Sequence, residues 1–300
     1  MTEHENADAT MDRLLRTTPA MDMAVASALL LEVKQVFDEL GVVFFLRQGT
    51  CLGAIREHAF IPWDDDIDIG SIVGMHGFDE GKIEPVADAF RARGFYVQRD
   101  TVDEEMWLGI MKDGIRIDWL CLRNRQGYIL HFPGVLLPIR LFEDLKEVEF
   151  LGEKFLTANP PEEYLRIKYG PEWMTPKQLD YGGDVIANMP EGPIPGHPGR
   201  LRQRLLAMMP GRSARVRVLD ASGAPISGAT VTLAGWGAYP TNGAGYARFY
   251  LPHDEVYAIV IEGGGRKEVL YEEQMKPGQT YVYRPDATVS SGRIFILMTE

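Results

Sequence analysis

The chain has 300 residues, of which 45% are hydrophobic and 25% charged, and its formal net charge is −12. This length suits two modest domains and supplies enough apolar side chains for a core without cross-links. The acidic charge argues against a nucleic-acid polymer as a partner, because such binding needs a basic footprint, but it does not exclude a nucleotide.

The first twenty residues are polar and acidic, so we expect residues 1–20 to be a disordered tail. They lack the basic start of a signal peptide. The apolar run at residues 28–31 is far too short to cross a membrane, so no transmembrane segment is expected. The only cysteines, Cys51 and Cys121, form no metal-ligand pair, which favours a reducing compartment. We therefore expect a cytoplasmic protein, with the inner face of a membrane as an alternative location.

Alternating helices and strands are predicted over residues 21–177. Apolar residues at helical spacing indicate helices over residues 23–40 and 83–90, and a further helix follows Gly49-Thr50 up to Arg56. Short strands are expected at residues 42–46 and 95–97. Asp113-Gly114 lies between two strand-like runs, residues 107–112 and 115–121, which is typical of a β-hairpin. A last helix is predicted near residues 162–168.

A linker rich in proline and glycine is predicted over residues 178–212. Within it, Arg200, Arg202 and Arg204 alternate with leucines. We interpret this patch as a short solvated helix rather than a membrane contact, because it is short and has no aromatic anchor. Period-two strands separated by glycine turns then predict a small antiparallel β-sandwich over residues 213–300.

The segment Asp64-Asp65-Asp66-Ile67-Asp68-Ile69 carries the main functional signal. In a strand, Asp64, Asp66 and Asp68 share one face, while Ile67 and Ile69 point into a core and Asp65 points away. Carboxylates this close repel each other unless a cation lies between them, and hard oxygen ligands select Mg²⁺ or Mn²⁺. An acidic surface turn is the alternative interpretation.

A third carboxylate is expected from the hairpin, because Arg116 and Asp118 share the strand face opposite Ile117. If the two strands pair, Asp118 completes the site. Gly49 and Thr50 offer backbone N–H groups and a hydroxyl to a phosphate, although a simple helix cap would also explain them. Arg56 and Arg116, with Lys112 as a further candidate, are the basic residues expected near such a phosphate.

The run from Gly49 to Arg56, followed by residues 60–69, closely resembles the signature of the LicD/fukutin family. Arg116-Ile117-Asp118 and residues 164–176 are also similar to that family, so the resemblance covers roughly residues 25–177. It implies an α+β fold of the nucleotidyltransferase type, with a mixed sheet and flanking helices over residues 21–177.

The same resemblance implies the roles of the site residues. Asp66, Asp68 and Asp118 would be catalytic metal ligands, and Gly49, Thr50 and Arg56 would bind the donor phosphates. Asp64 and Arg116 would support the ligands or contact substrate. The implied reaction is metal-dependent transfer of a phosphoalcohol, such as phosphocholine or an alditol phosphate, from a CDP-linked donor to a glycan or lipid-linked saccharide.

The sequence departs from the family at Glu57 and Ala59, where His and Gly are usual, and this leaves the donor alcohol open. A nucleotidyltransferase acting on a small molecule and a non-catalytic glycan-binding relative are the alternative functions. Residues 218–246 resemble a second family, the carboxypeptidase regulatory-like (transthyretin-like) sandwich. That resemblance implies a fold, with a structural or acceptor-docking role for the last domain.

Overall fold

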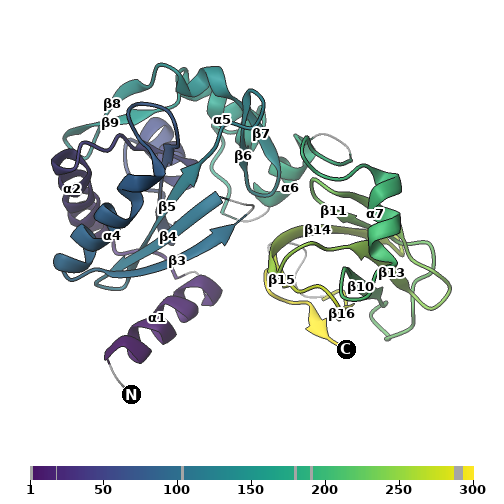
Figure 1. Cartoon of the computed structure of the whole chain (residues 1–300). Coiled ribbons are helices and arrows are strands. Elements are labelled where there is room, and N and C mark those ends of the chain that lie inside the picture. Colours follow the sequence, from purple (N-terminus) through teal and green to yellow (C-terminus); the bar gives the residue numbers. More distant parts are fainter. Residues whose placement is uncertain (1–2, 18, 103–104, 179–180, 190–191, 287–292) are drawn as a thin grey trace. The chain divides into compact units, whose positions relative to one another are not determined.

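The computed structural model describes residues 3–17, 19–102, 105–178, 181–189, 192–286 and 293–300. Residues 1, 2 and 18 of the predicted tail and residues 179–180 and 190–191 of the predicted linker lie outside these ranges. The chain divides into two compact units, which Figure 1 shows coloured along the sequence. The first comprises Met1–Leu130 and Leu137–Met174, and the second comprises His131–Leu136 and Thr175–Glu300.

A mixed sheet of five strands forms the centre of the first unit. Its strands are β1 Phe45–Leu46, β2 Asp66–Ile72, β3 Tyr96–Val102, β4 Glu105–Lys112 and β5 Ile115–Leu122, in the order β1-β2-β5-β4-β3. β2 and β5 run parallel, whereas the other neighbouring pairs are antiparallel. This confirms the predicted α+β class with a mixed sheet, and the hairpin predicted around Asp113-Gly114 is the turn between β4 and β5.

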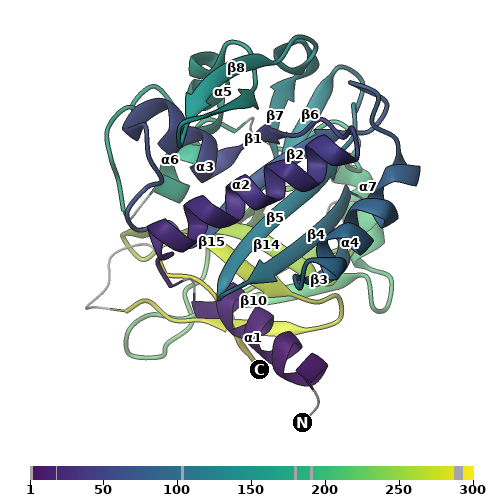
Figure 2. The same cartoon turned by 90° about the vertical axis from the view of Figure 1, so that its left-hand side faces the viewer.

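Two helices lie on one face of this sheet, α2 Met23–Glu39 and α4 Ile83–Ala92 (Figures 1 and 2). α2 begins at Asp22, whose carboxylate accepts hydrogen bonds from two N–H groups of the first turn. The ring of Phe37 packs against Phe90 of α4 and Trp119 of β5, with centroids 5.7 and 5.0 Å apart. Because strand residues alternate, the polar side chains of β5 lie on the opposite face of the sheet.

The expectation of a disordered tail is wrong for most of residues 1–20, because Glu3–Thr17 forms helix α1. Met11 and Leu14 are buried against Met111, and Ala7, Leu15 and Tyr96 pack around them. These apolar residues recur at intervals of three and four, so one stripe of an otherwise polar helix reaches the sheet. Tyr96 also donates a hydrogen bond from its hydroxyl to Asp8.

Shorter elements complete the first unit around the sheet. They are helix α3 Gln48–Leu52 with a π-helical turn at Gly53–Glu57, 3-10 turns at Glu80–Lys82 and Ile139–Phe142, strands β8 Lys146–Phe150 and β9 Glu153–Thr157, and helix α5 Pro161–Tyr169. β6 Tyr128–His131 and β7 Val135–Pro138 form a two-stranded sheet whose middle residues, His131–Leu136, belong to the second unit. The helix predicted near residues 162–168 corresponds to α5.

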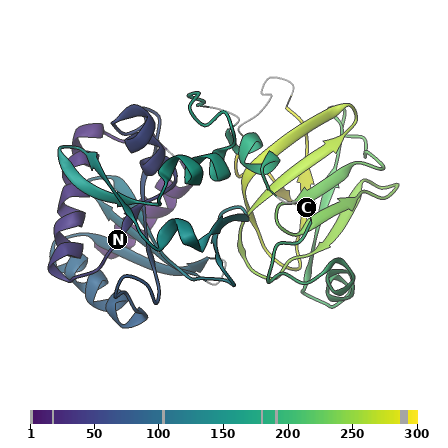
Figure 3. The same cartoon turned by 90° about the horizontal axis from the view of Figure 1, so that it is seen from above.

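The second unit contains two four-stranded sheets, whose strands can be followed in Figure 3. Their orders are β13-β10-β16-β17 and β12-β11-β14-β15. The strands are β10 Ser213–Val218, β11 Thr230–Leu233, β12 Gly237–Pro240, β13 Tyr246–Tyr250, β14 Glu255–Gly263, β15 Arg266–Met275, β16 Thr280–Tyr283 and β17 Met298–Thr299. Both sheets contribute to one buried cluster, as the layers of a sandwich do. The β10–β16 pair is parallel, unlike the all-antiparallel pairing expected from the sequence.

The predicted linker contains two helices, α6 Tyr181–Ala187 and α7 Arg200–Ala207. Val185 of α6 and Gln203 of α7 are buried within the second unit, to which residues from Thr175 onward belong. The high proline and glycine content of this segment therefore indicates short helices that pack on the second unit, and not an unpacked linker. No helix among the described residues combines the length and apolar composition that crossing a bilayer requires.

Candidate active site

Strands β2 and β5 bring two predicted ligands together. The strands pair in parallel with Asp68 opposite Asp118 and Asp66 opposite Arg116, so the pairing that the sequence left as a condition is met. Ile67, Ile69 and Ile117 are fully buried on the helix-covered face. Alternation then directs the aspartates to the other face of the sheet, where they form a single cluster.

A guanidinium group lies among these carboxylates. Arg116 donates hydrogen bonds to Asp118 Oδ2 at 3.1 Å, Asp65 Oδ2 at 3.0 Å and Asp66 Oδ2 at 2.5 Å. The prediction that Asp65 points away is wrong, because β2 begins only at Asp66 and strand alternation does not apply before it. Arg116, expected to support the ligands or contact substrate, is the central counter-charge of the cluster.

Residues of helix α3 contact the start of β2 and the aspartate that precedes it. The hydroxyl of Thr50 accepts a hydrogen bond from the backbone N–H of Asp68 at 2.8 Å, and Thr50 is fully buried. A Cβ at Gly49 would lie 2.5 Å from Asp64 Oδ2, so only glycine allows this close approach. The first intrahelical bond runs from the N–H of Cys51 to Arg47 O, which leaves the N–H groups of Gly49 and Thr50 ahead of it without a helical acceptor.

Three further residues hold the cluster and were not predicted as site residues. Arg47 is buried, and its guanidinium lies 3.7 Å from Asp68 Oδ1. Gln48 has a φ of 42° and donates from its side chain to Asp68 Oδ1 at 3.2 Å, while its backbone N–H donates to the Tyr164 hydroxyl at 2.7 Å. Arg47 and Gln48 directly precede the recognised Gly49-Thr50 pair, and this adjacency is the sequence signal that would have found them.

Two basic residues expected near the donor phosphates have other partners. Arg56 pairs with Glu57 Oε1 at 2.6 Å and donates to the carbonyl oxygen of Trp173 at 3.0 Å, so it connects the π-helical turn Gly53–Glu57 to the loop after α5. A role for Arg56 at a phosphate stays a prediction. Lys112 pairs with Glu32 of α2 at 2.8 Å, and α2 covers the face of the sheet opposite the aspartates, so the proposed place of Lys112 in the site is wrong.

Burial and mutual repulsion disfavour the ionised aspartates. Burial, and then Asp66, raise the pKa of Asp68 above its usual range despite Arg47. Burial also raises the pKa of Asp118, although Arg116 opposes it. Burial, together with Asp66 and Asp68, raises the pKa of Asp64. The cluster therefore holds more negative charge than its own arginines neutralise.

The residues present fit a divalent cation. In the described part of the chain, ion pairs join Asp65, Asp66 and Asp118 to Arg116 and Asp68 to Arg47, whereas Asp64 Oδ2 and Asp118 Oδ1 are buried oxygens with no hydrogen-bond partner. Oxygens of Asp64, Asp65 and Asp66 all lie within 4.8 Å of one another. This trio overlaps the predicted set of Asp66, Asp68 and Asp118 only at Asp66. A buried carboxylate oxygen without a donor is what a hard cation would satisfy.

Known proteins are similar to the part of the chain that contains the aspartate cluster. Residues 41–133 match the LicD/FKTN/FKRP nucleotidyltransferase domain family. Two proteins named ribitol 5-phosphate transferase FKRP, from Mus musculus and Homo sapiens, are each 26% identical over 155 residues. Those alignments cover 45% of this chain and only 29% of each FKRP protein. An uncharacterised protein of Rickettsia prowazekii is 26% identical over 154 residues, covering 48% of this chain and 53% of that protein. The family match spans all of α3, β2 and β5, and it ends before the second unit's two sheets begin.

Proposed function

We propose that the chain, whose residues 41–133 match the LicD/FKTN/FKRP nucleotidyltransferase domain family, is a phosphotransferase of the LicD/fukutin family. It would transfer a phosphoalcohol from a CDP-linked donor to a hydroxyl of a glycan or lipid-linked saccharide. The observation that supports this best is the pairing of Asp68 with Asp118 on parallel strands, beside a guanidinium and an unpartnered carboxylate oxygen. The activity for which the FKRP relatives are named, ribitol 5-phosphate transfer, is of the same class.

In this proposal Asp66, Asp68 and Asp118 hold the metal, with Asp64 behind them. A bound Mg²⁺ or Mn²⁺ would neutralise the donor pyrophosphate and stabilise the departing CMP. Arg47 has a buried Nε without a hydrogen-bond partner, so it can offer positive charge to a phosphate beside Asp68. The N–H groups of Gly49 and Thr50, which precede the first backbone hydrogen bond of α3, would serve as further donors.

Asp118 acts on the acceptor side. The acceptor hydroxyl oxygen attacks the phosphorus that carries the alcohol, and its proton passes to Asp118. The bond between this phosphorus and the bridging oxygen breaks, and CMP leaves with the electron pair. Arg116 stays hydrogen-bonded to Asp118 Oδ2 and fixes the orientation of the carboxylate.

The direct test follows the phosphorus by NMR with CDP-choline, CDP-glycerol and CDP-ribitol, each with and without Mg²⁺. Metal-dependent CMP release, with the phosphoalcohol appearing on an acceptor or as the free phosphate ester, supports the proposal. Release of inorganic pyrophosphate from a nucleoside triphosphate would instead assign nucleotidyl transfer to a small molecule. If calorimetry finds no binding of Mg²⁺ or Mn²⁺, the chain is better described as a glycan-binding relative without this activity.

A further inference from the structure

An arginine-rich stretch of the second unit has no acidic residue in it. Between Glu191 and Asp220 the sequence contains six arginines and neither Asp nor Glu, in a chain whose net charge is −12. These are Arg200, Arg202, Arg204, Arg212, Arg215 and Arg217. Helix α7 carries the first three of them, so the positive charge is concentrated on one exposed element.

One side of α7 is fixed to its own unit. Gln203 is buried and donates from its side chain to the carbonyl oxygens of Pro198 at 2.7 Å and Trp236 at 3.1 Å. Its side-chain oxygen accepts a hydrogen bond from the Tyr239 hydroxyl. Ala207, one turn further along, is buried in the core of the two sheets. The opposite side of the helix therefore faces outward in a defined orientation.

The outward side is apolar. Leu201 is 74% exposed and Leu205 is 55% exposed, and they are followed by Met208 at 66% and Met209 at 51%. Successive helical residues turn by about 100°, so Leu201, Leu205 and the C-cap residue Met208 form one stripe, which Met209 extends just beyond the end of the helix. A solvated helix would place polar residues there. The exposures therefore reverse the preference for a simple solvated helix that the sequence alone suggested.

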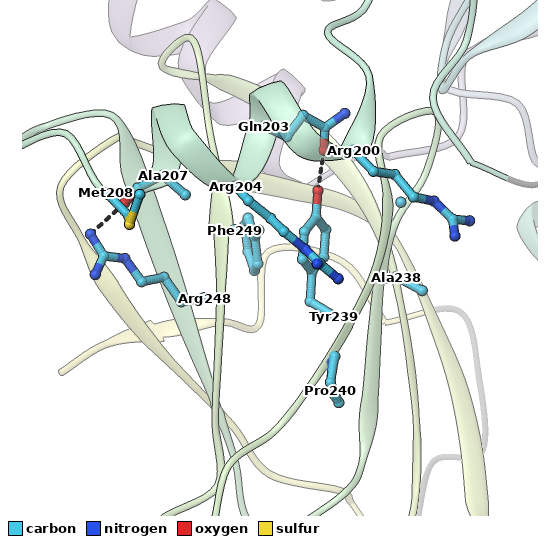
Figure 4. A pocket seen from close by; sticks show the side chains of 11 residues that line it. Arg200, Gln203, Arg204, Ala207, Met208, Ala238, Tyr239, Pro240, Arg248 and Phe249 are labelled. Carbon is cyan, nitrogen blue, oxygen red and sulfur yellow. Dashed lines mark hydrogen bonds between the residues drawn. The ribbon is translucent and has the colours of Figure 1, made fainter.

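Arginines border this stripe on both sides. At helical spacing, Arg200 and Arg204 lie along one edge and Arg202 along the other. No ion pair joins these three to any carboxylate in the described part of the chain. Arg200, Arg204, Tyr239 and Arg248 help to line a pocket of about 300 Å³. Figure 4 shows their side chains around it. Arg248 donates to the carbonyl oxygen of Ala207 at the end of the helix.

We propose that α7 binds the surface of a membrane containing anionic phospholipids. The stripe Leu201, Leu205, Met208 and Met209 enters the boundary between headgroups and acyl chains, and the bordering arginines contact lipid phosphates. Long arginine side chains can keep their charge at the headgroups while their stems lie along apolar surface. An aqueous phosphate ion would not need the apolar stripe, and an apolar protein partner would not need arginines on both of its edges.

Vesicle co-sedimentation tests this with the full chain. Vesicles of phosphatidylcholine mixed with phosphatidylglycerol should bind the protein, and vesicles of phosphatidylcholine alone should bind it at least about tenfold more weakly. The double variant Leu201→Gln/Leu205→Gln should lose most of the binding to anionic vesicles. Both side chains are exposed, so circular dichroism and thermal unfolding should match those of the unmodified protein.

Matched control variants separate the contribution of the arginines from that of the apolar stripe. Arg266→Gln removes an exposed arginine of β15 and should bind as the unmodified chain does, whereas Arg202→Gln should bind more weakly. Asp68→Asn should also bind normally, so a failure of the proposed catalysis and a failure of this inference are distinguishable. Equal binding by the double-leucine variant would overturn the inference. Self-association that the leucine changes abolish, without vesicle binding, would assign the stripe to a second copy and also overturn it.

Discussion

Thr50 shows how a residue of the recognised motif can act through the backbone of another. It was predicted to offer its hydroxyl to a phosphate, but that hydroxyl is fully buried and accepts the N–H of Asp68. This hydrogen bond holds the start of β2 against α3 and thereby fixes the position of Asp68 relative to Asp118. Thr50 is therefore a positioning residue in the structure.

We predict that Thr50→Val destabilises the fold and lowers metal affinity together. Valine has the same shape but leaves the Asp68 N–H buried without an acceptor, which costs about 1–3 kcal/mol in the free energy of unfolding. Urea unfolding and calorimetric titration with Mn²⁺ measure the two effects. Thr50→Ser keeps the hydroxyl and is the matched control. A Thr50→Val protein with unchanged stability would show that the hydrogen bond is not made in solution.

Asp68 carries the second prediction at this scale. Burial, with Asp66 beside it, raises the pKa of Asp68, so the fold disfavours its charged form at neutral pH when no metal is present. We expect Asp68→Asn to abolish turnover and to raise the metal-free Tm, by about 2–4 °C for each kcal/mol gained. Asp144→Asn changes an exposed carboxylate and should alter neither quantity. Full turnover by Asp68→Asn would refute the site assignment.

The sequence predicted the positions of those aspartates that lie within regular strands, because only there does the alternation of side chains apply. Asp66, Asp68 and Asp118 could be placed on one face because β2 and β5 obey the two-residue period. Asp65 could not, since where a strand begins depends on pairing that local sequence does not reveal. Tyr164 lies 116 positions from Gln48, and a hydrogen bond over that separation depends on the assembled fold.

At the scale of elements, composition misjudged the ends of the domains. The acidic start suggested disorder, yet the apolar residues at positions 7, 11, 14 and 15 give α1 a narrow stripe that packs on Met111. The proline-rich segment suggested a linker, yet it contains the helices α6 and α7, and each helix has buried side chains. Elements of this kind depend on tertiary packing rather than on propensity, so patterns along the chain reveal them poorly.

We predict that Met11→Ser releases α1 from the sheet. Met11 is fully buried, and removing a buried methionine side chain from a rigid core costs about 2–5 kcal/mol. A terminal helix can undock instead, so the loss appears as local opening rather than global unfolding. Trypsin should then cleave faster at Arg13, which is exposed in the helix. Ala9→Ser, on the exposed side of α1, should be cleaved at the unmodified rate. Equal rates for both variants would mean that α1 is not docked.

At the scale of the whole molecule, the proposed catalytic cluster lies within one unit and the proposed membrane surface within the other. Arg47, Gln48, Thr50 and Arg116, which bond to the aspartates, belong to the first unit. Helix α7 and the strands that it packs against belong to the second. The two proposed functions therefore rest on separate cores, and each can be lost while the other persists.

The boundary between the units determines which truncated chain should work. The linker predicted over residues 178–212 suggested a cut near Arg212, but residues from Thr175 onward pack within the second unit. A chain ending at Arg212 would keep α6 and α7 without the two sheets that bury Val185, Gln203 and Ala207.

We predict that a chain ending at Met174 folds, binds Mn²⁺ with the affinity of the full chain, and no longer sediments with anionic vesicles. The chain ending at Arg212 should aggregate, because its apolar helix faces have lost their core. Size-exclusion chromatography and calorimetry compare the two directly. The division would be refuted if the chain ending at Met174 aggregated while the longer one remained monomeric and bound metal. Such a result would mean that residues 175–212 stabilise the catalytic unit itself.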